Sequence, residues 1–286
     1  MQPAAYLAEL LSGASLHRTP CDHGEMVWQQ WSERGTPLVL LHGGFGSWNH
    51  WLKNIPGLRQ QRALWTLDLP GLGDSAELPE PHTSTHFAQV ILKGLDALLG
   101  SATHFELAGF SFGAMLGARV AELAGSRCER FTAIGAAGFG LLHKQVSLLR
   151  PPAAETPVEE ARLIHHSNLR TLMFSSEEFI DELAICAHGN NLEQHCFNSR
   201  KLSLSDDFVQ TLPLIQAPLV GVWGSLDATA GGRPNIEKRR ELFLSAQPGA
   251  RFHILDGVGH WAMYEVPELI NGILLQRSPQ PVAIPS

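Results

Sequence analysis

The segment that most constrains the fold is HFELAGFSFGAM, residues 104–115. It begins as an apolar run typical of a buried strand, passes through Gly-Phe-Ser-Phe-Gly, and continues at once with the apolar spacing of a helix. The glycines at 109 and 113 allow neighbouring backbone to pack against so sharp a turn. Such a turn projects Ser111 over the sheet, at a helix N-terminus that favours nearby negative charge. The segment therefore predicts an α/β sheet that carries a nucleophilic serine.

Short apolar runs alternate with helical segments along the chain, which indicates a mostly parallel sheet covered on both faces. We expect strands at residues 37–41, 63–67, 104–108, 131–134, 219–223 and 252–255. The alternation over residues 26–31 favours an antiparallel strand at the sheet edge. Helical spacing predicts helices over about 85–99 and 112–123, and residues 1–18 are expected to form an amphipathic leading helix.

The alternation of strands and helices is interrupted in the middle of the chain. Residues 141–206 are rich in helix formers, contain Pro151-Pro152, and show no unit of strand, turn and helix. The alternation resumes at Leu219, so the segment interrupts one sheet and is not a tandem second domain. We therefore predict a core domain of residues 1–140 and 207–286, with a helical cap at 141–206.

A catalytic serine needs a base, because a serine hydroxyl is a weak nucleophile. His260 lies in the glycine-rich segment LDGVGHWAMYE, after the last predicted strand, and Asp227 follows the strand at 219–223 in the segment GSLD. In a triad the carboxylate fixes the imidazole tautomer and stabilises the imidazolium that forms when the serine loses its proton. We predict Ser111, Asp227 and His260 as this triad, in the chain order serine, acid, histidine.

Three other aspartates are candidates for the acid of the triad. Asp256 is the rival candidate, but it lies only four residues before His260 and is expected to belong to the turn. Asp68 and Asp74, in DLPGLGDS, are expected to order a turn of their own. Asp227 is therefore the preferred acid.

Acyl transfer also needs donors for the oxyanion, since these hydrogen bonds often supply the largest electrostatic contribution. Residues 38–46, LVLLHGGFG, end a predicted strand in a loop whose glycines let main-chain N–H groups turn toward a substrate. We assign the oxyanion hole to the backbone of Gly44 and Phe112, with Phe45 as the alternative. His42 is expected to stabilise this loop and not to act as a base.

The composition excludes several classes of function. With 44% hydrophobic and 17% charged residues, the chain of 286 residues is neither a disordered polymer nor an apolar span. Lys and Arg total 21 against 28 Asp and Glu, a formal net charge of −7, and no basic cluster offers the phosphate contacts that nucleic acids require. The N-terminus has no basic residue before its apolar part and carries Glu9, which argues against a secretory signal.

No metal or cofactor is predicted. The segment 186–196, CAHGNNLEQHC, could suggest zinc, but adjacent His195 and Cys196 point in different directions on a helix. The chain has no Gly-x-Gly-x-x-Gly after the first parallel strand and no Walker loop. The chain has four scattered cysteines: Cys21, Cys128, Cys186 and Cys196. This pattern is typical of reduced thiols, so we expect a cytoplasmic protein, with the periplasm as the alternative.

Together these motifs resemble the α/β-hydrolase superfamily over nearly the whole chain. They are HGG at 42–44, DLPGLGDS at 68–75, GFSFG at 109–113, GSLD at 224–227 and GHW at 259–261. Within the superfamily the chain is most similar to the meta-cleavage product hydrolases and related serine esterases, through its GHWAMYE segment and its HGG loop. Meta-cleavage product hydrolases cut carbon–carbon bonds in dienoate products of aromatic ring cleavage. The resemblance implies the α/β-hydrolase fold, a helical lid, hydrolysis without a cofactor, often oligomers, and a triad at Ser111, Asp227 and His260.

The resemblance also bears on substrate contacts. Members of the subfamily usually carry Asn just before the nucleophile, whereas this chain has Phe110. They also usually hold the substrate carboxylate with an arginine of the cap, and Arg200 in the segment FNSRK is the best match for it. Phe45 and Trp261 also lie near the motifs, and aromatic residues in the cavity would favour an apolar or aromatic acyl group. We predict substrate contacts from Phe45, Phe110, Arg200 and Trp261. The alternatives are core packing for the aromatic residues and an exposed helix position for Arg200.

The sequence therefore predicts a serine hydrolase acting on a small molecule, without nucleic acid or membrane partners. The same triad serves cleavage of a carbon–carbon bond in a 2-hydroxy-6-oxo-dienoate, hydrolysis of a small carboxylic ester, and hydrolysis of a lactone. Phe110 favours an ester, whereas the GHW segment and Arg200 favour a dienoate. A remote alternative is a non-catalytic ligand receptor, against which the complete triad argues.

Overall fold

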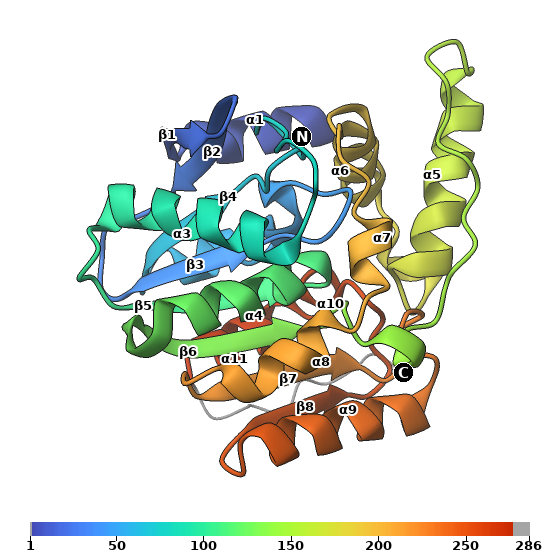
Figure 1. The fold of residues 1–286 in the computed structure, drawn as a ribbon. Coiled ribbons are helices and arrows are strands. Elements are labelled where there is room, and N and C mark those ends of the chain that lie inside the picture. The colour runs from blue at the N-terminus through green and yellow to red at the C-terminus, as the bar shows by residue number, and fades with distance from the viewer. Residues whose placement is uncertain (1, 277–286) are drawn as a thin grey trace.

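The computed structural model describes residues 2–276, and its centre is one eight-stranded sheet (Figure 1). The strand order is β1-β2-β4-β3-β5-β6-β7-β8, with β3 to β8 parallel and the β1–β2 and β2–β4 pairs antiparallel. Helices cover both faces, so the predicted fold class is confirmed. The predicted core range ends at residue 286, and its last ten residues lie outside the described part of the chain.

The six parallel strands lie where the apolar runs predict them, with bounds that differ by at most three residues. They are β3 (Pro37–Leu41), β4 (Ala63–Leu67), β5 (Phe105–Phe110), β6 (Cys128–Ile134), β7 (Leu219–Gly224) and β8 (Arg251–Leu255). Every residue of β4, β5 and β7 is buried, because helices cover both faces of the sheet there. These strands therefore carry continuous apolar runs instead of an alternating pattern.

The N-terminal region differs from the prediction of one leading helix. Helix α1 (Pro3–Ser12) ends before Gly13, and the following residues form β1 (Ser15–Cys21), which pairs with β2 (Gly24–Gln30). The sheet edge is therefore β1, and β2 lies one strand further in. Only two residues of β1 are buried, Thr19 and Cys21, so its apolar alternation is too short to be recognised in the sequence.

Two hydrophobic clusters hold the helices to the sheet, one on each face. The first includes α3 (Ser84–Leu99), α4 (Phe112–Ala124), α8 (Asp207–Thr211) and α9 (Arg233–Ala246). The second includes α1 together with α2 (Ile55–Leu58), α10 (Ala262–Glu265), α11 (Pro267–Leu274) and the short helix η1 (Trp48–Trp51). Helices α3 and α4 lie side by side (Figure 1), which fixes the direction of α4 and hence of the turn before it.

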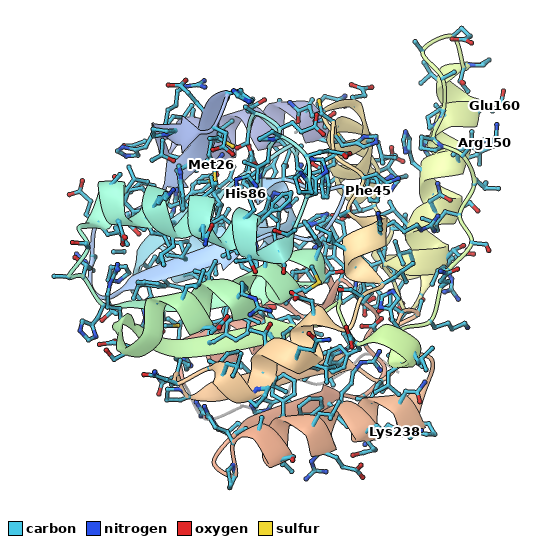
Figure 2. All side chains as sticks on the ribbon, viewed as in Figure 1. Met26, Phe45, His86, Arg150, Glu160 and Lys238 are labelled. Atoms are coloured by element: carbon cyan, nitrogen blue, oxygen red, sulfur yellow. The ribbon has the colours of Figure 1, made fainter. Side chains whose placement is uncertain are left out.

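Between β6 and β7 the chain forms helices and loops alone, among them α5 (Val158–Leu172), α6 (Glu182–Glu193) and α7 (Arg200–Ser203). We call residues 141–206 the insertion. Its helices gather beyond the edge at which the parallel strands end, and α5 stands out from the body as an arm (Figure 1). Arg150 and Glu160 lie on this arm (Figure 2). Within residues 2–276, each helix is too short or too polar to cross a bilayer.

Candidate active site

Ser111 occupies a strained turn between β5 and α4. Its φ of +52° and ψ of −114° are unfavourable for a residue with a side chain, so the surrounding structure must hold the turn in place. The Ser111 N–H donates to the Ile134 carbonyl at 2.9 Å, and the Ser111 carbonyl accepts from the Ala137 N–H at 3.0 Å. The side chain is partly accessible. A constrained backbone thus presents an accessible hydroxyl.

The glycines that flank the serine are required by close backbone contacts. A Cβ atom at Gly109 would lie 2.5 Å from the Ala114 Cα atom, and one at Gly113 would lie 2.1 Å from the His42 carbonyl oxygen. Contacts this short are incompatible with any side chain. The same packing brings the loop after β3 against the start of α4.

His260 and Asp227 form a buried hydrogen-bonded pair. The His260 Nδ1–H donates to Asp227 Oδ2 at 2.8 Å, and Asp227 Oδ1 accepts from the Thr229 N–H at 2.8 Å and the Thr229 hydroxyl at 2.7 Å. Burial alone would raise the pKa of Asp227, but the charge and hydrogen bonds of His260 and Thr229 outweigh it and lower that pKa. The carboxylate is therefore ionised, and its bond to Nδ1 leaves Nε2 of His260 to act as a base.

The serine turn and this pair meet at the ends of adjacent strands. The ring of Phe110, directly before Ser111, packs against the His260 ring with 4.8 Å between centroids. A Cβ atom at Gly135 would lie 3.1 Å from His260 Nδ1 and 3.3 Å from Asp227 Oδ2, and Gly135 follows the Ile134 that binds Ser111. The fold therefore brings the three predicted triad residues to one place.

The other aspartates have different partners. Asp256 is largely exposed and accepts a hydrogen bond from Arg233 at 2.7 Å. Asp68 accepts from the backbone N–H groups of Trp48 and Asp74, which orders the turn as expected. The carboxylate bonded to His260 is that of Asp227.

The loop after β3 lies directly against the serine turn. A Cβ atom at Gly43 would lie 3.3 Å from the Ser111 Cβ atom, and one at Gly44 would lie 3.6 Å from the Phe112 Cβ atom. No hydrogen bond among residues 2–276 uses the Gly44 or Phe112 N–H, and Phe112 is the first residue of α4, where an N–H has no acceptor within the helix. Within residues 2–276 the two amides therefore have no internal acceptor.

His42 stabilises this loop, as expected. Its Nε2 accepts the Leu69 N–H at 2.8 Å and its Nδ1 donates to the Gly43 carbonyl at 2.7 Å. Full burial lowers the pKa of His42 to about 4, so the ring is neutral at neutral pH. Both ring nitrogens are occupied by backbone groups, which leaves no free nitrogen for base catalysis.

The four predicted substrate-contacting residues lie in different surroundings. Phe45 has a φ of +51°, is partly exposed, and faces the His195 ring of the insertion at 5.1 Å. Phe110 and Trp261 are buried, and the Trp261 indole N–H donates to the His50 carbonyl. Arg200 is exposed and donates to the Val146 carbonyl at 3.1 Å. Contact of these side chains with a substrate stays a prediction.

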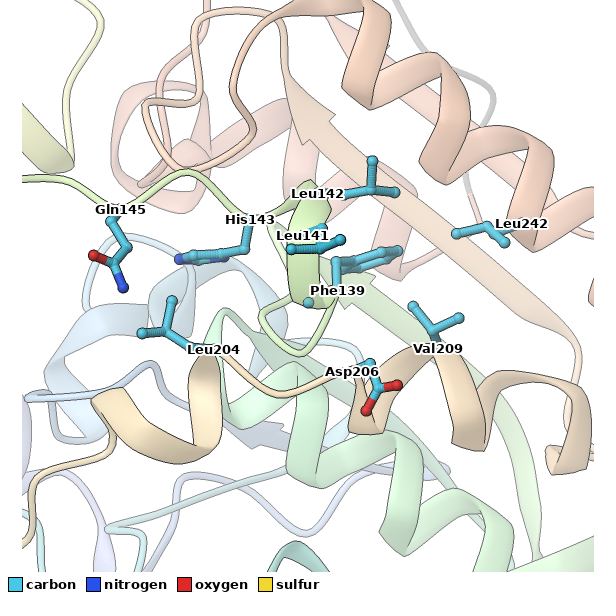
Figure 3. Close-up of a pocket in the computed structure, with 10 residues that line it drawn as sticks. Phe139, Leu141, Leu142, His143, Gln145, Leu204, Asp206, Val209 and Leu242 are labelled. Atoms are coloured by element: carbon cyan, nitrogen blue, oxygen red, sulfur yellow. The ribbon is translucent and has the colours of Figure 1, made fainter.

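A cleft of about 740 Å³ lies where residues 139–145 meet Leu204, Asp206 and Val209 (Figure 3). Apolar side chains form most of its lining: Phe139, Leu141, Leu142, Leu204, Val209 and Leu242. His143 lies in the wall of the cleft. Its burial, the main cause, and the nearby His260, the second, lower the pKa of His143 to about 4. Ser111, Asp227 and His260 are not part of the lining, and the link between them and the cleft is the electrostatic effect of His260 on His143.

Glu265 is a residue of the site that the sequence did not single out. Its carboxylate accepts the Gly259 N–H at 3.0 Å, the Ser175 N–H at 2.6 Å and the Ser175 hydroxyl at 2.9 Å. Gly259 directly precedes His260, and Ser175 follows α5, so one side chain joins the histidine turn to the insertion. Its position five residues after the predicted catalytic histidine is the sequence signal for it.

The histidines and cysteines of residues 186–196 do not form a metal-binding group with a third ligand. His188 approaches His165 instead, with 3.0 Å between their Nδ1 atoms across α5 and α6. Among residues 2–276 no three His, Cys, Asp or Glu side chains are arranged to hold a metal ion.

Comparisons with known proteins agree with this architecture. The family model described as the alpha/beta hydrolase fold matches residues 36–267. A Pseudomonas putida protein, the dihydrolipoyllysine-residue acetyltransferase component of an acetoin cleaving system, is 29% identical over 258 residues, which are 85% of this chain and 63% of that protein. This chain thus spans less than two thirds of that relative.

A second relative matches over nearly its full length. The 2-hydroxy-6-oxononadienedioate/2-hydroxy-6-oxononatrienedioate hydrolase 2 of Pseudomonas putida is 24% identical over 268 residues, 85% of this chain and 87% of that protein. Among solved structures, a bacterial membrane phospholipase A superposes with a TM-score of 0.75 at 21% identity, covering 96% of this chain and 90% of that one. The family match spans most of the chain, from before the Gly43–Gly44 loop to beyond His260, and the chain accordingly belongs to the α/β-hydrolase fold family.

Proposed function

We propose that the chain hydrolyses carboxylic esters, with Ser111 as nucleophile, His260 as general base and Asp227 as the acid that orients the histidine. The observation that carries the proposal is the buried hydrogen bond between Asp227 and His260, next to the strained turn that presents Ser111. Strain at one residue and an ionised buried carboxylate are both costly to a fold, and a catalytic role explains both.

In the proposed reaction, Ser111 Oγ attacks the ester carbonyl carbon while His260 Nε2 takes the hydroxyl proton. The imidazolium then gives that proton to the alcohol oxygen, the carbon–oxygen bond breaks, and the acyl group stays on Ser111. A water molecule repeats the sequence and releases the acid. Asp227 stays ionised throughout and stabilises the imidazolium.

Two further features support an ester with an apolar part. The N–H groups of Gly44 and Phe112 make no other hydrogen bond within residues 2–276, and they are the proposed donors to the tetrahedral oxyanion. The apolar cleft beside His143 is the proposed seat of the hydrocarbon part of the substrate. A helical lid at 141–206 belongs to the same proposal.

Cleavage of a carbon–carbon bond in a dienoate is the second candidate, and the Pseudomonas putida dienedioate hydrolase aligned over 85% of the chain favours it. Two observations weigh against it. Phe110 places a buried aromatic ring against His260 where the subfamily usually has Asn, and Arg200 donates to a main-chain carbonyl. For these reasons we place the ester reaction first.

The test compares substrates and labels the nucleophile. The purified chain is expected to hydrolyse p-nitrophenyl butyrate, to bleach a yellow 2-hydroxy-6-oxo-dienoate slowly or not at all, and to be labelled by a fluorophosphonate on Ser111, identified by peptide mass spectrometry. S111A and H260A should lose turnover while they keep the wild-type circular dichroism spectrum. Faster turnover of the dienoate would put the second candidate first. An unlabelled, inactive wild-type chain would refute the hydrolytic mechanism.

A further inference from the structure

Ser199 lies in the insertion, yet its hydroxyl touches the loop proposed to bind the oxyanion. The residue precedes α7, one position before the predicted Arg200, and is only 2% exposed. A Cβ atom at Gly44 would lie 2.2 Å from Ser199 Oγ and 3.6 Å from the Phe112 Cβ atom. The hydroxyl is therefore in contact with the backbone that carries one proposed donor and close to the residue that carries the other.

This hydroxyl has no hydrogen-bond partner in the described part of the chain. Ser199 stands at the N-cap of α7, but its side chain caps nothing, and the Arg200 N–H is bound by Asn198 Oδ1 at 3.0 Å. The hydroxyl is not among the fully enclosed polar atoms of these residues that lack a partner, so it keeps contact with solvent although the residue is almost buried. A serine hydroxyl that is unpaired and still accessible can donate to an incoming substrate.

The backbone around Ser199 is firmly attached to the core domain. The N–H groups of Cys196 and Phe197 both donate to the Gly71 carbonyl, at 2.8 and 3.0 Å. The Phe197 ring packs against the ring of Phe87 at 5.1 Å and that of Phe112 at 5.9 Å between centroids. The backbone next to Ser199 is thus held in place before any substrate arrives, as the support of an effective transition-state donor must be.

We propose that Ser199 is a further catalytic residue, whose hydroxyl donates a third hydrogen bond to the substrate carbonyl oxygen as it becomes an oxyanion. This inference rests on the proposed ester hydrolysis and deepens it. The proton stays on Ser199 Oγ throughout, so the step adds stabilisation without proton transfer. A neutral donor suits this position, since the two backbone N–H groups beside it are neutral as well.

The test separates transition-state stabilisation from packing. S199A removes the donor, S199C keeps the volume with a poor donor, and S203A is the matched control one turn further along the insertion, where the side chain is half-buried. With p-nitrophenyl butyrate, S199A and S199C are each expected to lose about tenfold to a hundredfold in kcat, with KM within about twofold of wild type. Their affinity for a boronic acid that forms a tetrahedral adduct should fall by a similar factor, and S203A should match wild type.

The outcomes distinguish this inference from the proposed function. If wild type is labelled on Ser111 and hydrolyses the ester while S199A keeps the wild-type kcat, Ser199 is not a donor and only this inference fails. An S199C variant as active as wild type would show that the side chain fills space. A fall confined to KM would place Ser199 in substrate binding and overturn the catalytic role. If the wild-type chain neither labels nor turns over, both proposals are refuted.

Discussion

Two buried aspartates show how immediate neighbours decide the charge of a side chain. Asp227 accepts three hydrogen bonds of 2.7 to 2.8 Å, one of them from an imidazole that can become positive, and its pKa is lowered. Asp68 is equally buried but accepts longer bonds of 2.9, 3.2 and 3.4 Å from neutral donors, and burial raises its pKa to about 7. Burial raises the pKa at both sites, and only the charge and hydrogen bonds around Asp227 reverse its effect.

Asp68 should make the stability of the fold depend on pH. Its pKa is higher in the folded chain, at about 7, than its ordinary value of 3.8, so its protonated form contributes stability that is full below about pH 3.8 and lost as the pH rises through about 7. Relative to D68N, wild type should lose up to about 1.4 kcal/mol per pH unit between pH 5 and 7. Urea unfolding of both proteins at pH 5, 6, 7 and 8 measures this difference.

The control for that measurement is D256N, which changes an exposed aspartate and should show a constant offset from wild type. If the offset between wild type and D68N is equally constant, Asp68 is already ionised at pH 5 and its raised pKa is wrong.

Among the secondary-structure elements, the short helix α10 connects the turn that carries His260 to the insertion. Glu265, at its end, binds the N–H before His260 and both polar groups of Ser175, while the Trp261 N–H donates to the Met173 carbonyl at 2.8 Å. The histidine is therefore fastened on both sides to the segment that follows α5. We regard Glu265 as a positioning residue, since it acts through the backbone of Gly259.

E265Q should lower kcat by about tenfold or more with little change in KM. An amide cannot accept all three hydrogen bonds, so the turn that carries His260 would shift. E268Q, the same change at an exposed position of α11, should behave as wild type. S175A removes only the bond on the insertion side, so it should lose less kcat than E265Q. Equal losses in S175A and E265Q, or a loss explained by melting below the assay temperature, would contradict a role in positioning His260.

The elements differ in how well the sequence predicted them. Strands β3 and β4 match their predicted bounds because they are buried on both faces and end at glycine or aspartate turns. Ser111, His260 and Asp227 could be proposed from the sequence because each follows a strand. Strand β1 was missed because its buried side is two residues long. Ser199 gave no signal and Glu265 only its spacing from His260, because their partners are distant in sequence.

For the whole molecule, a buried amide pair fastens the insertion to the core domain. Asn191 of α6 exchanges two hydrogen bonds with Asn49, at 2.8 and 2.9 Å, and accepts a third from the Ser47 hydroxyl at 2.8 Å. Ser47 ends the loop that also carries Gly44, and Asn49 lies in η1 directly after it. The insertion and the proposed oxyanion loop are therefore held to each other by side chains 142 residues apart in the sequence.

N191A should cost about 2 kcal/mol or more of unfolding free energy, because it leaves the buried Asn49 side-chain amide without partners and the buried Ser47 hydroxyl without an acceptor. It should also make the insertion more sensitive to limited proteolysis. N190A, at the exposed neighbouring position, should change stability by less than about 0.5 kcal/mol. Equal stability and equal cleavage patterns for the two variants would show that the amide pair does not hold the insertion.

The attachment of residues 196 and 197 to Gly71 has a consequence for engineering. A chimaera that takes residues 141–206 from another family member would replace the Ser199 hydroxyl next to the proposed oxyanion hole as well as part of the cleft lining. Swapping this module to change selectivity would then alter turnover as well, unless the donor segment brings a serine to the same spot. Grafts that start after Ser199 would keep this hydroxyl next to the proposed oxyanion hole.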